Sequence, residues 1–106
     1  MQPIVLNKLK LYPDRRRVEV EGVRVDGIGY PGWDFIYALA RAPGTLVSRD
    51  MLFVSVYPDP ETRPPMGSRA VDQIAHKVRK RLAQKAEGHN FIRAISNGGY
   101  VLVAPD

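Results

Sequence analysis

Apolar and polar residues alternate along the first thirty positions of the chain. Aliphatic side chains occupy every second position in three short runs: Leu9 and Leu11, Val18 and Val20, Val23 and Val25. Charged residues stand between them, and Glu21-Gly22 supplies a turn between the second and third runs. Because successive side chains of a strand point to opposite faces, the pattern predicts a small antiparallel sheet over residues 1–30 with one buried face.

A helical spacing replaces this alternation over residues 31–42. The large apolar residues of this segment form one wide face: Trp33, Phe35, Ile36, Leu39 and Ala40. Pro31 suits the first position of a helix, Asp34 falls in the first predicted turn, and Pro43-Gly44 follows the end. The segment predicts a helix that buries its apolar face.

A second helix is predicted to begin after Ser48 and to run to about Tyr57. Ser48 is a favoured N-cap residue, and Asp50 lies in the first turn, where a negative charge is stabilised. Val47 and Leu52 have the spacing of a hydrophobic staple across the helix start. Residues 58–67 hold four of the nine prolines and predict a loop.

The remaining pattern predicts a third helix over about residues 69–85, capped by Ser68, and a closing hairpin. One stripe of this helix is apolar: Val71, Ile74, Ala75, Val78 and Leu82. The hairpin would join residues 91–95 to residues 100–103 through Ser96-Asn97-Gly98-Gly99, because Asn-Gly between apolar strands is a strong turn signal. The whole pattern predicts one α+β domain over residues 1–106.

Composition excludes several classes of protein. The 106 residues contain no cysteine, which excludes disulfides, thiolate metal sites and a thiol nucleophile. The chain has neither a run of 18 apolar residues nor a signal-peptide pattern, so no membrane contact is expected. We therefore expect a cytoplasmic protein.

The net charge of +5 is concentrated in the third predicted helix. Residues 69–85 carry six basic residues and one acidic residue, and the acids and bases of the rest of the chain cancel. A helical projection places basic, imidazole or amide side chains opposite the apolar stripe: Arg69, Gln73, His76, Lys77 and Lys80. Asp72 and Arg79 share one flank. Such a face is either an ordinary solvated surface or a helix for the major groove of DNA, where Gln73, His76 and Lys77 would reach base edges.

Three other motifs give weaker indications. Gly27-Ile28-Gly29-Tyr30-Pro31-Gly32 matches the glycine pattern of dinucleotide-binding loops, but no βαβ unit follows, so we interpret it as a turn into the first helix. His76 and His89 lie 13 residues apart with no thiol nearby, and no metal site is predicted. Ser48 and Asp50 fit a helix cap better than a catalytic pair, so neither a cofactor nor catalytic activity is expected.

The chain resembles one known family over roughly residues 9–103, and three blocks carry the resemblance. They are Ala42-Pro43-Gly44-Thr45-Leu46-Val47-Ser48-Arg49-Asp50-Met51-Leu52, then Arg69-Ala70-Val71-Asp72 with Val78-Arg79-Lys80-Arg81-Leu82, and finally Ile92-Arg93-Ala94-Ile95 with Gly99-Tyr100-Val101-Leu102. In this order they resemble the C-terminal DNA-binding domain of OmpR/PhoB-type response regulators of bacterial two-component systems. The resemblance implies a winged helix-turn-helix: a small N-terminal sheet over residues 1–30, three helices over residues 31–85 and a wing hairpin over residues 91–103.

Carried over position by position, the resemblance implies sequence-specific DNA contacts by a transcriptional regulator. Gln73, His76 and Lys77 would face bases, with Asp72 joining them. The implied phosphate contacts are Ser48, Arg49, Arg69, Arg79 and Lys80. The implied wing residues are Arg93, Ser96, Asn97, Gly98, Gly99 and Tyr100. The implied partners are double-stranded DNA of the nucleoid, RNA polymerase through the loop of residues 58–67, and a second copy in head-to-tail order on direct repeats.

The chain departs from the family pattern at several positions. Ser96 stands where many members have an arginine that enters the minor groove, so weak binding by a single copy is expected. Gly29 and Gly32 replace a threonine and a glutamate, and Ala75 replaces an isoleucine. Ser96 and the long proline-rich loop favour an alternative function. In it, the chain is a winged-helix module that contacts RNA polymerase or another regulator and binds DNA only weakly. With no receiver domain expected, the chain would be a free-standing regulator or the effector domain of a longer one.

Overall fold

Two antiparallel sheets enclose three helices in the computed structural model, which describes residues 2–65, 69–85, 91–96 and 98–103. The N-terminal sheet contains β1 (Ile4–Leu6), β2 (Leu9–Tyr12), β3 (Arg17–Val20) and β4 (Val23–Arg24). The helices are α1 (Gly29–Ala40), α2 (Arg49–Val56) and α3 (Ala70–Lys85). The second sheet contains β5 (Val47–Ser48), β6 (Ile92–Ile95) and β7 (Gly99–Leu102). Within these residues, no helix combines the length and apolarity that a bilayer crossing requires.

The N-terminal sheet is a meander in the order β1-β2-β3-β4. Its inward residues pair across β2 and β3, Leu9 with Val20 and Leu11 with Val18, and all four are buried as the alternation predicts. The Glu21-Gly22 turn is confirmed, with both residues at positive φ. Val23 is a correction: it is exposed rather than buried, and it lies in β4, a two-residue strand at the edge of the sheet.

Helix α1 buries the predicted face, including Trp33, Phe35 and Ile36, but its predicted start was wrong. The helix begins at Gly29 after Ile28, so Pro31 is its third residue and Asp34 lies beyond the first turn. Proline fits here because the first turn of a helix leaves its N–H groups without intrahelical partners. The end is also earlier than predicted, at Ala40.

Helices α2 and α3 form the pair predicted for a helix-turn-helix. The Ser48 hydroxyl accepts a hydrogen bond from the Met51 amide at 3.2 Å, which confirms the predicted N-cap. Helix α3 buries four residues of the predicted stripe and half-buries Ile74: the four are Val71, Ala75, Val78 and Leu82. The predicted cap at Ser68 lies outside the described residues.

The wing, formed by β6 and β7, is the predicted hairpin, with Ile92 opposite Leu102, but Gly99 pairs with Ile95 as the first residue of β7 instead of lying in the turn. The sequence pattern missed the third strand of this sheet, since β5 pairs with the other edge of β7 and places Ser48 opposite Gly99. Gly99 allows this approach, because a Cβ there would collide with the backbone carbonyl of Val47. The strand before α2 and the wing therefore belong to one sheet.

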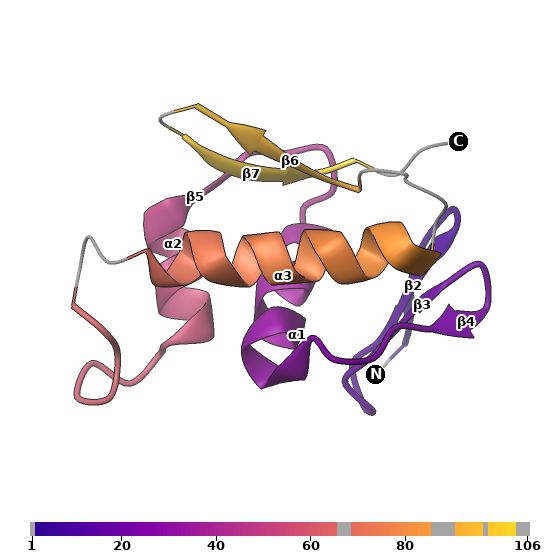
Figure 1. Ribbon diagram of the computed structural model, residues 1–106, viewed down its shortest axis with the longest axis horizontal. Helices are drawn as coiled ribbons and strands as arrows, with labels where there is room; N and C mark the ends of the chain where they lie inside the picture. The colour runs from indigo at the N-terminus through magenta and orange to yellow at the C-terminus, as the bar shows by residue number, and fades with distance from the viewer. Residues whose placement is uncertain (1, 66–68, 86–90, 97, 104–106) are drawn as a thin grey trace.

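The packing of the helices and sheets leaves the outer side of α3 exposed. Figure 1 shows α3 in orange across the front, the wing in yellow above it, and α2 beside its N-terminal end. The N-terminal sheet lies at the C-terminal end of α3. Helix α1 packs against α2, α3 and β7, and its Gly32 lies so close to α3 that a Cβ would approach Val78 to 3.1 Å. The core thus holds α3 by its inner stripe alone.

Candidate nucleic-acid interface

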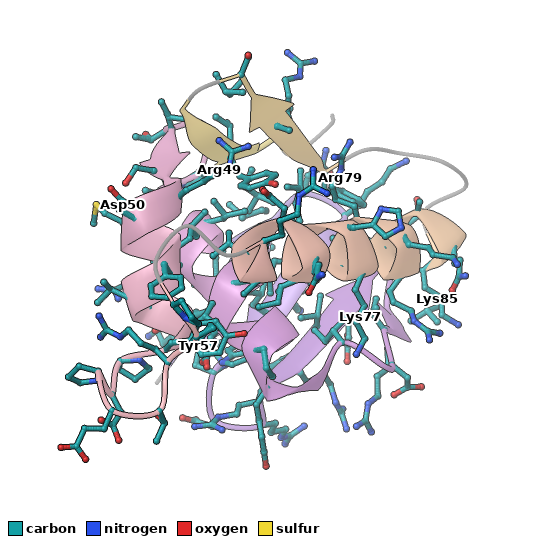
Figure 2. The ribbon with its side chains drawn as sticks, turned by 60° about the vertical axis from the view of Figure 1, so that its left-hand side comes forward. Arg49, Asp50, Tyr57, Lys77, Arg79 and Lys85 are labelled. Atoms are coloured by element: carbon teal, nitrogen blue, oxygen red, sulfur yellow. The ribbon has the colours of Figure 1, made fainter. Side chains whose placement is uncertain are left out.

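The outer face of α3 carries the side chains that the sequence analysis selected. Arg69 directly precedes the helix, and the remaining exposed residues of this face are Gln73, His76, Lys77 and Lys80. Arg79 is half-buried. Figure 2 shows Arg79 on the side of α3 that faces the wing and Lys77 on the opposite side. The two basic side chains therefore project toward different flanks of the helix.

An open hollow of about 590 Å³ lies where α2, α3 and the wing meet. Its lining comes from these three parts of the chain, and all six lining residues belong to the predicted site: Arg49, Arg69, Asp72, Gln73, His76 and Tyr100. Figure 2 shows Arg49 reaching from the start of α2 toward the wing. The fold thus gathers, around one concavity, residues that are up to 51 positions apart in the sequence, as Arg49 and Tyr100 are.

Three of these residues form a contact that we call the Asp72 cluster: Arg49, Asp72 and Tyr100. Asp72 Oδ1 accepts a hydrogen bond from the Tyr100 hydroxyl at 2.5 Å and one from Arg49 Nε at 3.1 Å. The Arg49 guanidinium also lies over the Tyr100 ring, 5.4 Å from its centroid. The cluster joins α2, α3 and β7 at one carboxylate oxygen.

Burial anchors the tyrosine of this cluster. Tyr100 is only 4% exposed, and its ring packs edge-on against Phe35 of α1 with centroids 5.4 Å apart. Its hydroxyl therefore has a fixed position from which to donate to Asp72. Sequence reasoning placed Tyr100 in the wing but missed this role, for which the Gly-Tyr pair of the family motif was the available signal.

The cluster also shifts the acidity of its members. The hydrogen bond from Tyr100, reinforced by Arg49, lowers the pKa of Asp72 below its usual 3.8. Burial, followed by the hydrogen bond to Asp72, raises the pKa of Tyr100 above 10.0. The hydrogen bond to Asp72 raises the pKa of Arg49. At neutral pH the cluster is therefore an ionised carboxylate held between a cation and a neutral phenol.

The other predicted residues lie around this hollow rather than in it. Lys77 and Lys80 are exposed farther along α3, and Ser48 is half-buried with its oxygen engaged at the cap. In the wing, Arg93 and Ser96 are exposed, and Gly98 is half-buried. Asn97 lies outside the described residues. The structure thus brings together the predicted residues at the N-terminal end of α3 and spreads the rest along its face.

Two motifs that suggested other chemistry were the histidine pair and the glycine-rich segment before the first helix. The described residues contain no group of three or more histidine, cysteine, aspartate or glutamate side chains that could hold a metal ion, and His89 lies outside them. The segment from Gly27 to Gly32 leads from the edge strand β4 into α1, with Gly27 and Gly29 at positive φ. Its first two residues belong to the connection, and Gly29 to Gly32 are already the first four residues of α1.

Comparison with known proteins gives the same architecture. A family model described as "Transcriptional regulatory protein, C terminal" matches residues 32–102. The search of curated proteins gave no match. Among solved structures, the DNA-binding domain of CpxR from E. coli is 24% identical with a TM-score of 0.81, and all of both chains is covered. The RstA DNA-binding domain of Klebsiella pneumoniae, solved in complex with the RstA box, is 24% identical with a TM-score of 0.79, covering 99% of this chain and 100% of that one.

A further similar structure is the DNA-binding domain of E. coli CadC, at 23% identity and a TM-score of 0.76, covering 98% of this chain and 94% of that one. These likenesses confirm the winged helix-turn-helix fold. The family model spans α1 through β7, which includes the recognition helix and the wing that the sequence predicted. The chain therefore belongs to the family of C-terminal domains of transcriptional regulatory proteins, the OmpR/PhoB type that its sequence resembles.

Proposed function

We propose that this domain binds double-stranded DNA sequence-specifically in a transcriptional regulator, with α3 in the major groove. The observation that carries the proposal is the outer face of α3, whose exposed side chains are cationic or hydrogen-bonding and include no carboxylate among the described residues. This face borders an open hollow beside the wing. A helix of this kind suits the major groove, where phosphates flank base edges that lysine and glutamine recognise. The similar DNA-binding domain of RstA was solved in complex with the RstA box, which supports DNA binding by this chain.

The residues divide into two roles in this proposal. Gln73, His76 and Lys77 read bases, the role that the family resemblance implies for these three exposed residues of α3. The phosphate contacts are Ser48, Arg49, Arg69, Arg79 and Lys80, which lie at the start of α2, directly before α3 and along α3. Asp72 holds Arg49 and Tyr100 in place through Oδ1, and any base contact by Asp72 would come from Oδ2.

Binding by one copy is expected to be weak, and pairing would compensate. The wing turn offers Ser96 rather than a cation, and Arg93 lies back along β6. We propose that two copies bind direct repeats head to tail and that the role is binding without a catalytic step. Such a regulator would be located in the cytoplasm and would bind DNA there.

A second candidate function, contact with RNA polymerase or another regulator, is favoured by one observation. Met51 and Val54 lie one turn apart on α2 and are 64% and 49% exposed. They precede the proline-rich loop of residues 58–67, the segment that the family resemblance assigns to polymerase. Exposed apolar side chains of this kind are typical of protein contacts rather than DNA contacts.

The experiment that separates these functions begins with selection of bound sites from random duplexes. The affinity for the selected duplex is then measured against salt concentration. Neutralisation of about four to six phosphates predicts a slope of log K against log salt of roughly −4 to −5. A response that does not depend on salt would remove the DNA function and leave the protein-contact function.

Two lysines test the division of roles along α3. Lys80→Ala should weaken binding to all duplexes alike and reduce the salt slope by about 1. Lys77→Ala should change the preference among base pairs in the selected site. Arg41→Ala, directly after α1, is the control for loss of one positive charge and should affect neither property. Identical behaviour of the two lysine variants would contradict the assigned roles.

A further inference from the structure

A second concave site lies on the N-terminal sheet, and it shares no lining residue with the hollow beside α3. This cavity of about 330 Å³ is formed where β3 and β4 meet the start of α1. We call it the arginine pocket, because four arginines line it: Arg15, Arg16, Arg17 and Arg24. Its other walls are residues 25–30 and Trp33, and Asp26 is the one carboxylate among the lining residues. Figure 1 shows the chain passing from β4 into α1 at this junction.

The arginines of the pocket are only partly neutralised. Arg24 pairs with Asp26 at 3.0 Å, and Arg17 pairs with Glu19 at 3.7 Å. Arg15 and Arg16 make no ion pair within the described part of the chain. Burial raises the pKa of Asp34, and the nearby charge of Arg16 opposes this shift without reversing it. Two guanidinium groups thus remain available to an anion.

A further cation lies at the edge of the pocket. The Arg81 guanidinium of α3 lies against Gly27, where a Cβ would be 3.0 Å from Arg81 Cζ. Gly27 has a φ of +84°, and its missing side chain leaves room for this approach. The fold therefore brings arginines from the β2–β3 turn, β3, β4 and α3 to one junction.

The start of α1 adds a partial positive charge to the same cavity. Gly29 and Tyr30 are its first two residues and line the pocket. No side chain caps this end, and its first turn contains no acidic residue. The free N–H groups of a helix start favour anions, as guanidinium groups do through paired hydrogen bonds to phosphate oxygens. Two independent features, side chains and backbone, thus favour negative charge in one space.

We propose that the arginine pocket binds the phosphate group of a small phosphorylated molecule. The volume is at the lower end of the range for small-molecule sites, which suits a phosphate or pyrophosphate group with the rest of the ligand outside. Tyr30 is 67% exposed and lies beneath Arg16, 4.6 Å from its guanidinium carbon to the ring centroid. This flat surface offers the outer part of the ligand a stacking contact. The site is independent of the proposed DNA function.

The test uses the intact chain and pyrophosphate as the probe, at constant ionic strength with chloride as the competing salt. Titration followed by NMR should give saturable shifts centred on the amides of Arg15, Arg16 and residues 27–30. Arg16→Gln should weaken pyrophosphate binding at least fivefold. Arg41→Gln removes the same charge and a similar ring contact, because Arg41 lies 5.7 Å from the ring of Tyr37, and it should change binding less than twofold.

Three results would overturn the proposal: linear shifts without saturation, shifts centred on α3, or equal losses in both variants. The phosphate bound in the pocket could belong to a small molecule or to the DNA backbone. Measuring duplex binding by the same two variants distinguishes these sources. A small-molecule site predicts that both substitutions change DNA affinity equally. If Arg16→Gln weakens duplex binding at least fivefold more than Arg41→Gln does, the pocket binds the DNA backbone and the small-molecule site is refuted. The NMR titration of the wild type remains decisive if a variant does not fold.

Discussion

The hydrogen bond between Tyr100 and Asp72 ties the wing to α3, and its removal is a quantitative test of the Asp72 cluster. Tyr100→Phe deletes the hydroxyl but keeps the buried ring and its edge-on contact with Phe35. Asp72→Ala removes the acceptor. A double-mutant cycle isolates the coupling between the two groups, because the other costs of each substitution cancel.

The expected coupling follows from charge and exposure. A hydrogen bond to a charged group contributes about 1.5–3 kcal/mol when water is excluded. The Asp72 side chain is 44% exposed, so water competes and we expect a coupling of about 1 kcal/mol. The ion pair between Arg49 and the same carboxylate is similarly exposed and should couple by only about 0.2–1 kcal/mol.

Urea unfolding of the wild type, both single variants and the double variant measures this coupling. A matched control cycle combines Tyr100→Phe with Asp50→Ala, which removes an exposed acid from the first turn of α2. The control cycle should be additive within about 0.3 kcal/mol. Additivity of the Asp72 cycle to the same precision would refute the claim that this hydrogen bond holds the wing against α3.

Three further predictions follow from local geometry. Gly99→Ala should cost about 2–3 kcal/mol in urea unfolding, because its Cβ collides with the β5 backbone, whereas Gly22→Ala meets open space and should cost only about 1–2 kcal/mol of backbone strain. Ser48→Ala should cost about 1 kcal/mol and speed hydrogen exchange in the first turn of α2; unchanged exchange there would contradict the cap. The pKa of Asp72 is lower in the folded state, so its contribution is present above pH 3.8 and lost as the pH falls through the folded pKa. Accordingly, the stability difference between wild type and Asp72→Ala should shrink from pH 7 to pH 3, and a constant difference would contradict the shift.

Most of the fold could be predicted from local patterns in the sequence. The period-two runs, the apolar faces of the helices and the Ser48 cap each depend on residues within one or two turns of each other, and the structure confirms them. The start of α1 was misplaced for a physical reason. Pro31 fits any position of a first turn, since none of those N–H groups has an intrahelical partner, so proline alone does not fix the boundary.

Pairings between distant residues could not be predicted in this way. Strand β5 has two residues, too few for a period, and it forms only because β7 passes beside it. The helical projection placed Asp72 on a flank of α3, but its partners lie 23 and 28 positions away. No single-sequence pattern connects such positions, although the type of each residue was consistent with its contact.

The arginine pocket also depends on residues that are distant in the sequence, so its concentration of positive charge could not be predicted from the sequence. Counted along the chain, the acids and bases outside residues 69–85 cancel, which gives no indication of a second basic region. The fold separates those charges in space and gathers four arginines around one cavity. The run Arg15-Arg16-Arg17 was the visible signal, and its meaning depended on where Arg24 and the start of α1 would lie.

The pairing of β5 with β7 has a consequence for how this domain can vary. Because α2 is anchored at its first residue by a strand of the wing sheet and by the Asp72 cluster, its angle to α3 does not depend on the chain that connects the two helices. Lengthening such a connection is thermodynamically cheap, at about 0.6 kcal/mol for each doubling. Insertions and new prolines among residues 58–65 can therefore accumulate without altering the face that reads DNA. If this loop contacts a partner protein, as proposed, that contact surface can diversify without a change in the proposed DNA-binding face of α3.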